Sequence, residues 1–242
     1  MAIHTTRLLV PNDTPYSLGR HVKHDDASWD YRIELPATVK DVTTVWTYSL
    51  PVLNQGQTSS CTGNAMAGFF NTDFAASVRK AKGVEWLTET MALQFYSDAT
   101  HEEDDPSDYY PPNDNGSDGL DVCKAAVQLG WADRYAHAFG FNDFRIALQK
   151  QPVCVGTVWT NDMFNVDSNY QMHPGSLDQS NLAGGHEYLA LEIHYDTQLI
   201  WFLTSWGQDF ARRGMFSMSF ADFEGLLDQQ GDVVAPHGIG MG

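Results

Sequence analysis

The sequence of 242 residues has only three cysteines, at positions 61, 123 and 154, and no long apolar run. Three cysteines cannot form a closed set of disulfide bonds, and their spacing does not match the paired cysteines of zinc sites. No stretch approaches the roughly 20 apolar residues that cross a bilayer. The sequence therefore predicts no disulfide-stabilised scaffold, no metal site and no membrane partner.

Basic residues are also scarce, with 14 Lys and Arg against 31 Asp and Glu, which gives a formal net charge of −17. Phosphate contacts require clustered Lys and Arg, so nucleic acid is not an expected partner. The first residues, MAIHTTRLLVPNDTPYSLGR, lack the apolar core of a secretory signal. We expect a cytoplasmic protein, or a virion-associated one if it is phage-encoded, and no cofactor.

What is present indicates a globular chain, with 43% hydrophobic residues and seven tryptophans. Residues 1–35 read as an irregular N-terminal arm, and residues 36–242 as one domain. Its front half, about 36–150, is helical in pattern, and its back half, about 151–242, is rich in strand patterns. Helices are expected over 60–82, 88–99, 118–129 and 142–150, and strands within PVCVGTVW, EYLALEIHYD, LIWFLTSW and GMFSMSF. This order predicts an α+β fold with a cleft between the halves.

Cys61 lies in PVLNQGQTSSCTGNAMAGFF, at the junction of a turn-rich stretch and an apolar helical run. Ser59 or Ser60 is a natural N-cap, which places Cys61 at the helix start. A helix N-terminus lowers the pKa of a thiol and so favours the nucleophilic thiolate. Gln55 offers an amide that, with the Cys61 backbone N–H, could stabilise an oxyanion. The alternative is a small buried residue at a helix start.

Cys123 and Cys154 lie in runs of helical and strand character, LDVCKAAVQLG and PVCVGTVW. Free cysteine is among the residues most often buried, so we expect both to be packing thiols. A disulfide between them is the alternative. The acidic loop at 101–119 lacks the ligand spacing of an EF-hand, so we interpret it as a solvated loop.

Five segments, taken together and in order, resemble papain-like (C1-like) cysteine peptidases over roughly residues 36–220. NQGQTSSCTGNA is similar to the segment of the catalytic cysteine, and AGGHEYLALEIHYD to the segment of the catalytic histidine. LTSWGQDFARRGMFSM resembles the Ser-Trp-Gly turn with its strand. LQKQPVCVGTV resembles a strand entry, and NGSDGLDVCKAA a glycine-containing loop before a helix. The variant SCTGNA looks like stand-alone bacterial or phage members. The resemblance implies a papain-like fold of two subdomains.

Carried over by position, the resemblance implies that Cys61 is the nucleophile, His186 the general acid and base, and Gln55 an oxyanion donor. A reactive pair requires a distance of about 3.5–4 Å between the sulfur and a ring nitrogen. The two glycines before His186 indicate an exposed turn at that residue.

Trp206 matches the indole that shields the histidine, and Gly116 or Gly119 matches backbone positions that hold an extended substrate. Thr204 stands where the family has an asparagine that orients the imidazole. A threonine hydroxyl also accepts a hydrogen bond, but its side chain is shorter. We therefore expect weakened rather than abolished catalysis.

The leading hypothesis is a thiol hydrolase that cleaves peptide or amide bonds in a peptide or protein substrate. A catalytically degenerate protein with a binding or structural role, for example in a virus particle, is the alternative. An isopeptidase or transpeptidase would use the same thiol. The arm of about 35 residues is shorter than the family's inhibitory prosegments, and its sequence does not decide whether it crosses the cleft.

Overall fold

A computed structural model of the chain describes residues 4–6, 14–24, 26–33, 40–48, 51–102 and 105–237. The helices are α1 (Cys61–Phe70), α2 (Ala76–Lys82), α3 (Glu89–Thr100), α4 (Gly119–Gln128), α5 (Gly140–Lys150) and α6 (Phe220–Asp228). The strands are β1 (His4–Thr6), β2 (Val22–His24), β3 (Thr44–Val45), β4 (Arg134–His137), β5 (Val153–Thr160), β6 (Leu182–His194), β7 (Leu199–Leu203), β8 (Met215–Ser219) and β9 (Asp232–His237).

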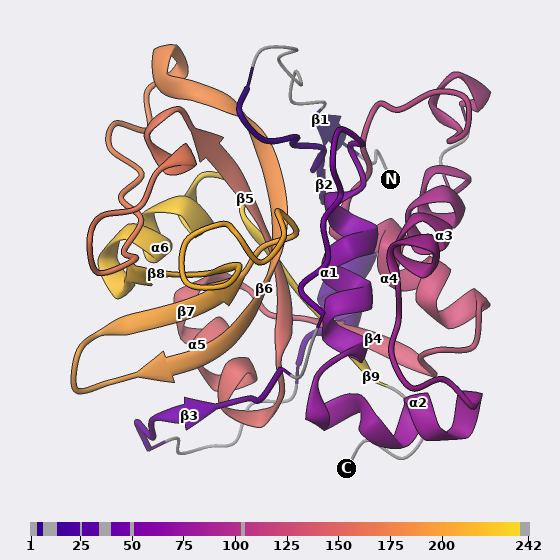
Figure 1. The fold of residues 1–242 in the computed structure, drawn as a ribbon, viewed down its shortest axis with the longest axis horizontal. Coiled ribbons are helices and arrows are strands. Elements are labelled where there is room, and N and C mark those ends of the chain that lie inside the picture. Colours follow the sequence, from indigo (N-terminus) through magenta and orange to yellow (C-terminus); the bar gives the residue numbers. More distant parts are fainter. Residues whose placement is uncertain are drawn as a thin grey trace.

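The larger sheet has the order β4-β9-β5-β6-β7-β8, and β3 pairs with β6 outside that path. Every neighbouring pair is antiparallel. Helices α1 to α4 lie on one side of β6, and α5 and α6 lie with the strands on the other side (Figure 1). This arrangement confirms the predicted α+β class.

Two apolar clusters form the core, one on each side of the sheet. One joins α1, α3 and α4 to the sheet face that carries Cys154 and Leu189. The other joins α5 and α6 to the opposite face, around Trp159 and Phe202. Side chains alternate between the faces of a strand, so the long strand β6 supplies both clusters. Cys123 and Cys154 are buried free thiols, which confirms the packing role and shows that the disulfide alternative is wrong.

The prediction of a single helix over residues 60–82 is wrong, because helix α1 ends at Phe70. The side chain of Asn71 exchanges two hydrogen bonds with the backbone of Leu87, at 2.8 and 2.9 Å. Thr72 bonds back to the Phe69 carbonyl at 2.7 Å. These polar groups compete with the helical ladder, and the chain restarts as α2 after a short 3-10 turn.

Of the helices and strands in the described ranges, six have no counterpart among those expected, namely helix α6 and strands β1, β2, β3, β4 and β9. Strand β4 is only four residues long, and its partner strand β9 lies nearly 100 residues later in the sequence. Helix α6 directly follows β8, and Ser219 caps it through a hydrogen bond from the Asp222 N–H at 3.0 Å. Because β4 joins the same sheet as β5, the two halves of the sequence share one sheet.

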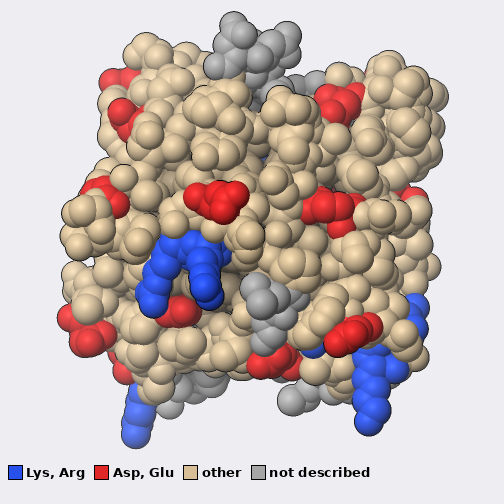
Figure 2. Space-filling view, viewed as in Figure 1, with Lys and Arg blue, Asp and Glu red and all other residues tan. Residues whose placement is uncertain are grey.

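Charged side chains are spread over the surface without one dominant patch on the face shown (Figure 2). Acidic groups are scattered across it, and the basic side chains that project lie mostly toward its lower part. None of the helices in the described ranges is both long and apolar enough to cross a membrane.

Candidate active site

Cys61 is the first residue of α1 and has no exposed surface. Ser60 precedes the helix, as expected, but its side chain does not cap it. The Ser60 hydroxyl instead contacts Thr58 Oγ1 at 2.7 Å and accepts a hydrogen bond from Asn64 Nδ2 at 3.1 Å. These bonds fix the loop that delivers Cys61 to the sheet.

Helix α1 packs against β6, and the backbone N–H of Glu187 on that strand lies close enough to the Cys61 thiol to influence its pKa. Glu187 directly follows His186 on β6, but successive residues of a strand point to opposite faces. No hydrogen bond joins the Cys61 thiol to the His186 ring, since Nε2 contacts Thr204 and Nδ1 has no partner, so the pairing of the two residues stays a prediction. Burial raises the pKa of Cys61 to about 12, although the Glu187 N–H acts in the opposite direction. The expectation of a lowered thiol pKa is therefore wrong for this state, because desolvation outweighs the helix terminus.

His186 lies within β6, not in an exposed turn, and is completely buried. The prediction of a turn was wrong because β6 already begins at Leu182 and runs through both glycines. The ring Nε2 is 2.8 Å from Thr204 Oγ1, whereas Nδ1 is buried and has no hydrogen-bond partner. Burial lowers the pKa of His186 to about 3, so the imidazole is neutral at pH 7.

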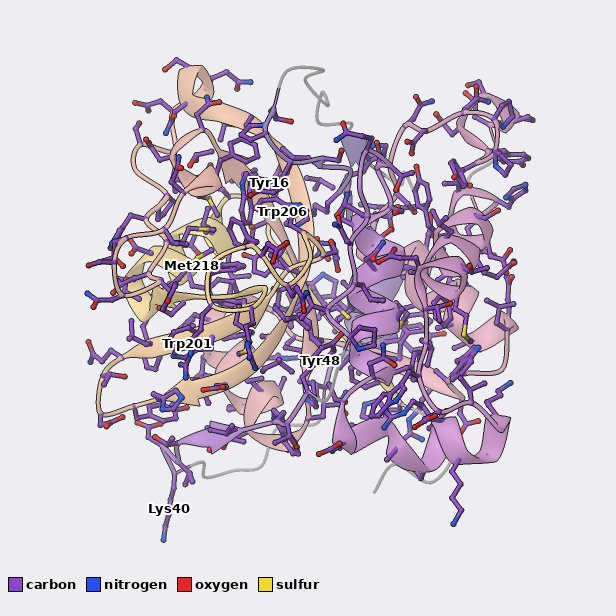
Figure 3. The ribbon with its side chains drawn as sticks, viewed as in Figure 1. Tyr16, Lys40, Tyr48, Trp201, Trp206 and Met218 are labelled. Carbon is purple, nitrogen blue, oxygen red and sulfur yellow. The ribbon has the colours of Figure 1, made fainter. Side chains whose placement is uncertain are left out.

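Aromatic rings enclose the imidazole of His186. Trp206 stacks on it with ring centroids 4.7 Å apart and an interplanar angle of 24°, and Trp159 meets it edge-on at 4.9 Å. Tyr16 of the N-terminal arm stacks on Trp206 with ring centroids 4.5 Å apart (Figure 3). Phe210 approaches the same indole at 4.8 Å. Trp206 therefore covers one face of the imidazole, and its role in shielding the histidine stays a prediction.

Gln55 is buried beside the Ser-Trp-Gly turn. Its backbone N–H donates to the Ser205 carbonyl at 2.9 Å, and its side-chain Oε1 accepts from Ser205 Oγ at 2.5 Å. The amide nitrogen Nε2 donates to the Thr58 carbonyl at 2.8 Å. An amide carries two donor hydrogens, so one remains for a further acceptor.

The N-terminal arm does run between the two halves of the fold, in extended backbone. The N–H groups of Gly19 and Arg20 donate to the carbonyl of Gly185 at 3.1 and 3.0 Å. On the other side, Ser117 N–H donates to the Gly19 carbonyl at 2.9 Å, and His21 N–H donates to the Ser117 carbonyl at 2.7 Å. In Figure 1 this part of the arm is the indigo segment that passes from the sheet to the helices.

Glycines allow this close approach. A Cβ on Gly19 would collide with the carbonyl of Ser59, two residues before Cys61. A Cβ on Gly116, whose φ is +95°, would collide with the carbonyl of Gly19. Ser117, which the sequence did not single out, makes the backbone hydrogen bonds. Of the two predicted glycines, Gly116 faces the arm backbone, and Gly119 faces the carboxylates of Glu187 and Asp232.

Two buried ion pairs anchor the arm, and no local sequence pattern indicates either of them. Lys23 pairs with Asp121 on α4 and lies 3.9 Å from Asp118. Arg20 has no exposed surface and pairs with Asp232 at the start of β9. The partners in each pair are about 100 or more residues apart in sequence. Within the described ranges, no three His, Cys, Asp or Glu side chains are grouped so as to hold a metal ion.

No family model and no curated protein matches the sequence. Solved structures do match its fold. Xylellain, a cysteine protease from Xylella fastidiosa, has a TM-score of 0.70 and 16% identity, over 96% of this chain and 99% of that one. Digestive procathepsin L 3 of Tenebrio molitor larval midgut has a TM-score of 0.60 and 14% identity, over 86% and 74%. ProCathepsin B S9 from Trypanosoma congolense gives 0.58 and 12%, over 96% and 85%. The chain therefore has the papain-like fold of cysteine proteases.

Proposed function

We propose that the chain is a thiol hydrolase that cleaves peptide or amide bonds and that the arm holds it in a latent state. The proposal rests on the position of the Cys61 thiol. The Cys61 thiol at the start of α1 lies beside the backbone of β6 at Glu187, directly after a buried histidine whose Nε2 is already bonded. A nucleophile, a base and a group that orients the base are the parts that such a reaction needs.

The tautomer of His186 follows from the contact with Thr204. If Nε2 carries the proton and donates it to Thr204 Oγ1, Nδ1 is left with a free lone pair. Nδ1 has no partner in this state, so it is available to accept the proton of the Cys61 thiol. The hydroxyl of Thr204 would thus orient the imidazole, as an asparagine does in papain-like peptidases.

The reaction begins once a substrate replaces the arm. The thiol proton moves to His186 Nδ1 as the sulfur attacks the carbonyl carbon. The Cys61 backbone N–H and the second hydrogen of Gln55 Nε2 stabilise the oxyanion. His186 then protonates the leaving amine, and water releases the acyl group by the same steps in reverse.

In the proposed latent state, burial keeps both the thiol and the imidazole uncharged. With the thiol pKa near 12 and the imidazole pKa near 3, both groups are neutral at pH 7. Removal of the arm would hydrate both groups and move both pKa values back toward their ordinary range. An arm that occupies the backbone sites of an extended peptide therefore blocks access and also deactivates the nucleophile.

The test is turnover of an unbiased peptide library by a parent chain that carries Gly19→Ala, whose added methyl collides with the Ser59 carbonyl and displaces the arm, compared with the same chain that also carries Cys61→Ala. We expect cleavage by the parent chain that the Cys61→Ala variant lacks entirely. A folded parent chain that cleaves no peptide and never forms an adduct at Cys61 would favour the second candidate, a non-catalytic binding protein. The complete burial of Cys61 and His186 is the observation in favour of that second candidate.

A further inference from the structure

The Arg20 side chain of the arm is buried beside the carboxylate of Asp232. Its Nε donates to Asp232 Oδ1 at 2.9 Å, and its Nη2 donates to the Gln230 carbonyl at 2.7 Å. The guanidinium also pairs with Asp232 through Nη2. Arg20 has no exposed surface, so this charge is held in the interior.

The pocket arises from the register of three neighbouring strands. Gly156 on β5 pairs with Glu187 on β6 and also with Asp232 on β9. Residues that pair across antiparallel strands point to the same face of the sheet. The side chains of Glu187 and Asp232 therefore lie on one face, on either side of Gly156. A Cβ on Gly156 would lie 2.6 Å from Arg20 Nε and 2.7 Å from Asp232 Oδ1. The missing side chain at Gly156 is the space that the guanidinium uses.

Gly119, the first residue of α4, closes the pocket on the side of the helices. A Cβ there would lie 2.5 Å from Asp232 Oδ2 and 3.0 Å from Glu187 Oε1. Two glycines from different elements thus face two acidic side chains, and any larger residue at either position would fill the space.

The acidic groups retain unused acceptors. Both carboxylate oxygens of Glu187 and the Oδ2 atom of Asp232 are buried without a hydrogen-bond partner, as is Nη1 of Arg20. Burial, and then the charge of Asp232, raise the pKa of Glu187. Buried unpaired acceptors are costly in a purely structural ion pair. Unpaired acceptors of this kind are expected instead in a site that different ligands occupy in turn.

The pocket lies beside the reacting groups. Glu187 follows His186 and supplies the N–H that reaches the Cys61 thiol, and the backbone of Arg20 bonds to Gly185, which precedes His186. An extended peptide on the same backbone sites would therefore place one side chain where Arg20 now lies.

We propose that Glu187 and Asp232 form a specificity pocket for a basic side chain, so that the substrates are peptides with Arg or Lys close to the cleaved bond. Arg20 occupies this pocket in the latent state as a substitute for that substrate residue. This inference rests on the proposed function for its substrate. The pocket itself can be tested without catalysis.

The binding test uses the full-length Arg20→Ala variant and methylguanidinium, with methylurea as the neutral control of similar shape. We expect a saturable rise in melting temperature of about 2–4 °C with methylguanidinium and none with methylurea. The parent chain should not respond, because Arg20 fills the pocket. The added substitution Asp232→Asn should abolish the rise, whereas Glu192→Gln, at an acidic residue of β6 outside the pocket, should not. A folded Arg20→Ala variant that responds equally to both compounds overturns the proposal.

The second measurement uses cleavage by the Gly19→Ala chain, which keeps Arg20 but displaces the arm from the site. Peptides carry Arg, Lys, citrulline or Leu at each position near the cleaved bond, and citrulline is the neutral isostere of Arg. We expect kcat/KM to favour Arg over citrulline by about 100-fold at one position and by less than about tenfold in Asp232→Asn. Equal rates for Arg and citrulline at every position contradict the specificity pocket. If no peptide is cleaved at all, the proposed function fails, and the melting experiment still decides whether the pocket binds a cation.

Discussion

Thr204 Oγ1 lies 2.8 Å from His186 Nε2, inside a shell of aromatic rings that excludes water. Thr204 is itself positioned by its backbone N–H, which donates to the Gly214 carbonyl at 3.0 Å. The hydroxyl is thus held at hydrogen-bonding distance despite the short side chain. The departure from the family's asparagine is compatible with an oriented imidazole.

Thr204→Val should lower kcat/KM by about tenfold, because one hydrogen bond to the imidazole is lost while the shape is kept. The effect should fall on kcat more than on KM, since the substitution does not touch the peptide backbone sites. Steady-state kinetics on the best library peptide measure it. Thr157→Val is the matched control, because Thr157 is equally buried and bonds Tyr188 at 3.0 Å instead. An equal loss of activity in both variants would count against an orienting role.

Gly19→Ala should displace the arm, because the added methyl collides with the Ser59 carbonyl. We expect the alkylation rate of Cys61 at pH 7 to rise by roughly tenfold or more as the covered state loses population. Intact mass spectrometry after timed iodoacetamide treatment measures the rate. Ser17→Ala is the control, since Ser17 contacts Trp206 Nε1 through its backbone carbonyl, at 3.2 Å. An unchanged rate in a folded Gly19→Ala variant would show that the arm does not limit access.

Stability should depend on pH through His186. Burial holds its pKa near 3 in the folded chain, against an ordinary value of 6.5. Between these values the unfolded chain binds a proton that the folded chain does not, so the free energy of unfolding falls as the pH drops. The contribution is fully present above pH 6.5 and decreases by at most about 1.4 kcal/mol per pH unit below it.

Urea unfolding at pH 7 and pH 4.5, for the parent chain and His186→Gln, isolates this contribution. His237 also has a lowered pKa, caused by burial and then by Arg134 and Lys150, so the variant retains part of the dependence. The parent chain should lose more stability than the variant between the two pH values. Identical losses would mean that His186 titrates normally and is not desolvated.

The parts of the site that lie within short segments could be predicted from local sequence patterns. The apolar spacing after Cys61 predicted a helix start, and the run that follows His186 predicted a strand. The turn at Trp206 was identifiable from three adjacent residues. Each of these features is encoded within about ten residues.

The remaining features depend on contacts that no local pattern encodes. The pocket for Arg20 needs strands β5, β6 and β9 in one register, and Asp232 is 212 residues away from Arg20. The burial of His186 comes from Trp159 and Trp206 together, so its flanking glycines gave a misleading indication of a turn. The break after Phe70 follows from the contact of Asn71 with Leu87.

Trapping by a peptidyl vinyl sulfone with Arg in the recognition position tests the central claim most directly. The proposed pairing of the Cys61 thiol with the His186 imidazole predicts a single adduct on Cys61 in the Gly19→Ala chain and none in the same chain with Cys61→Ala. It also predicts strongly slowed labelling with His186→Ala. Adduct formation at equal rates with and without His186, or on Cys123 and Cys154 as readily as on Cys61, would contradict it.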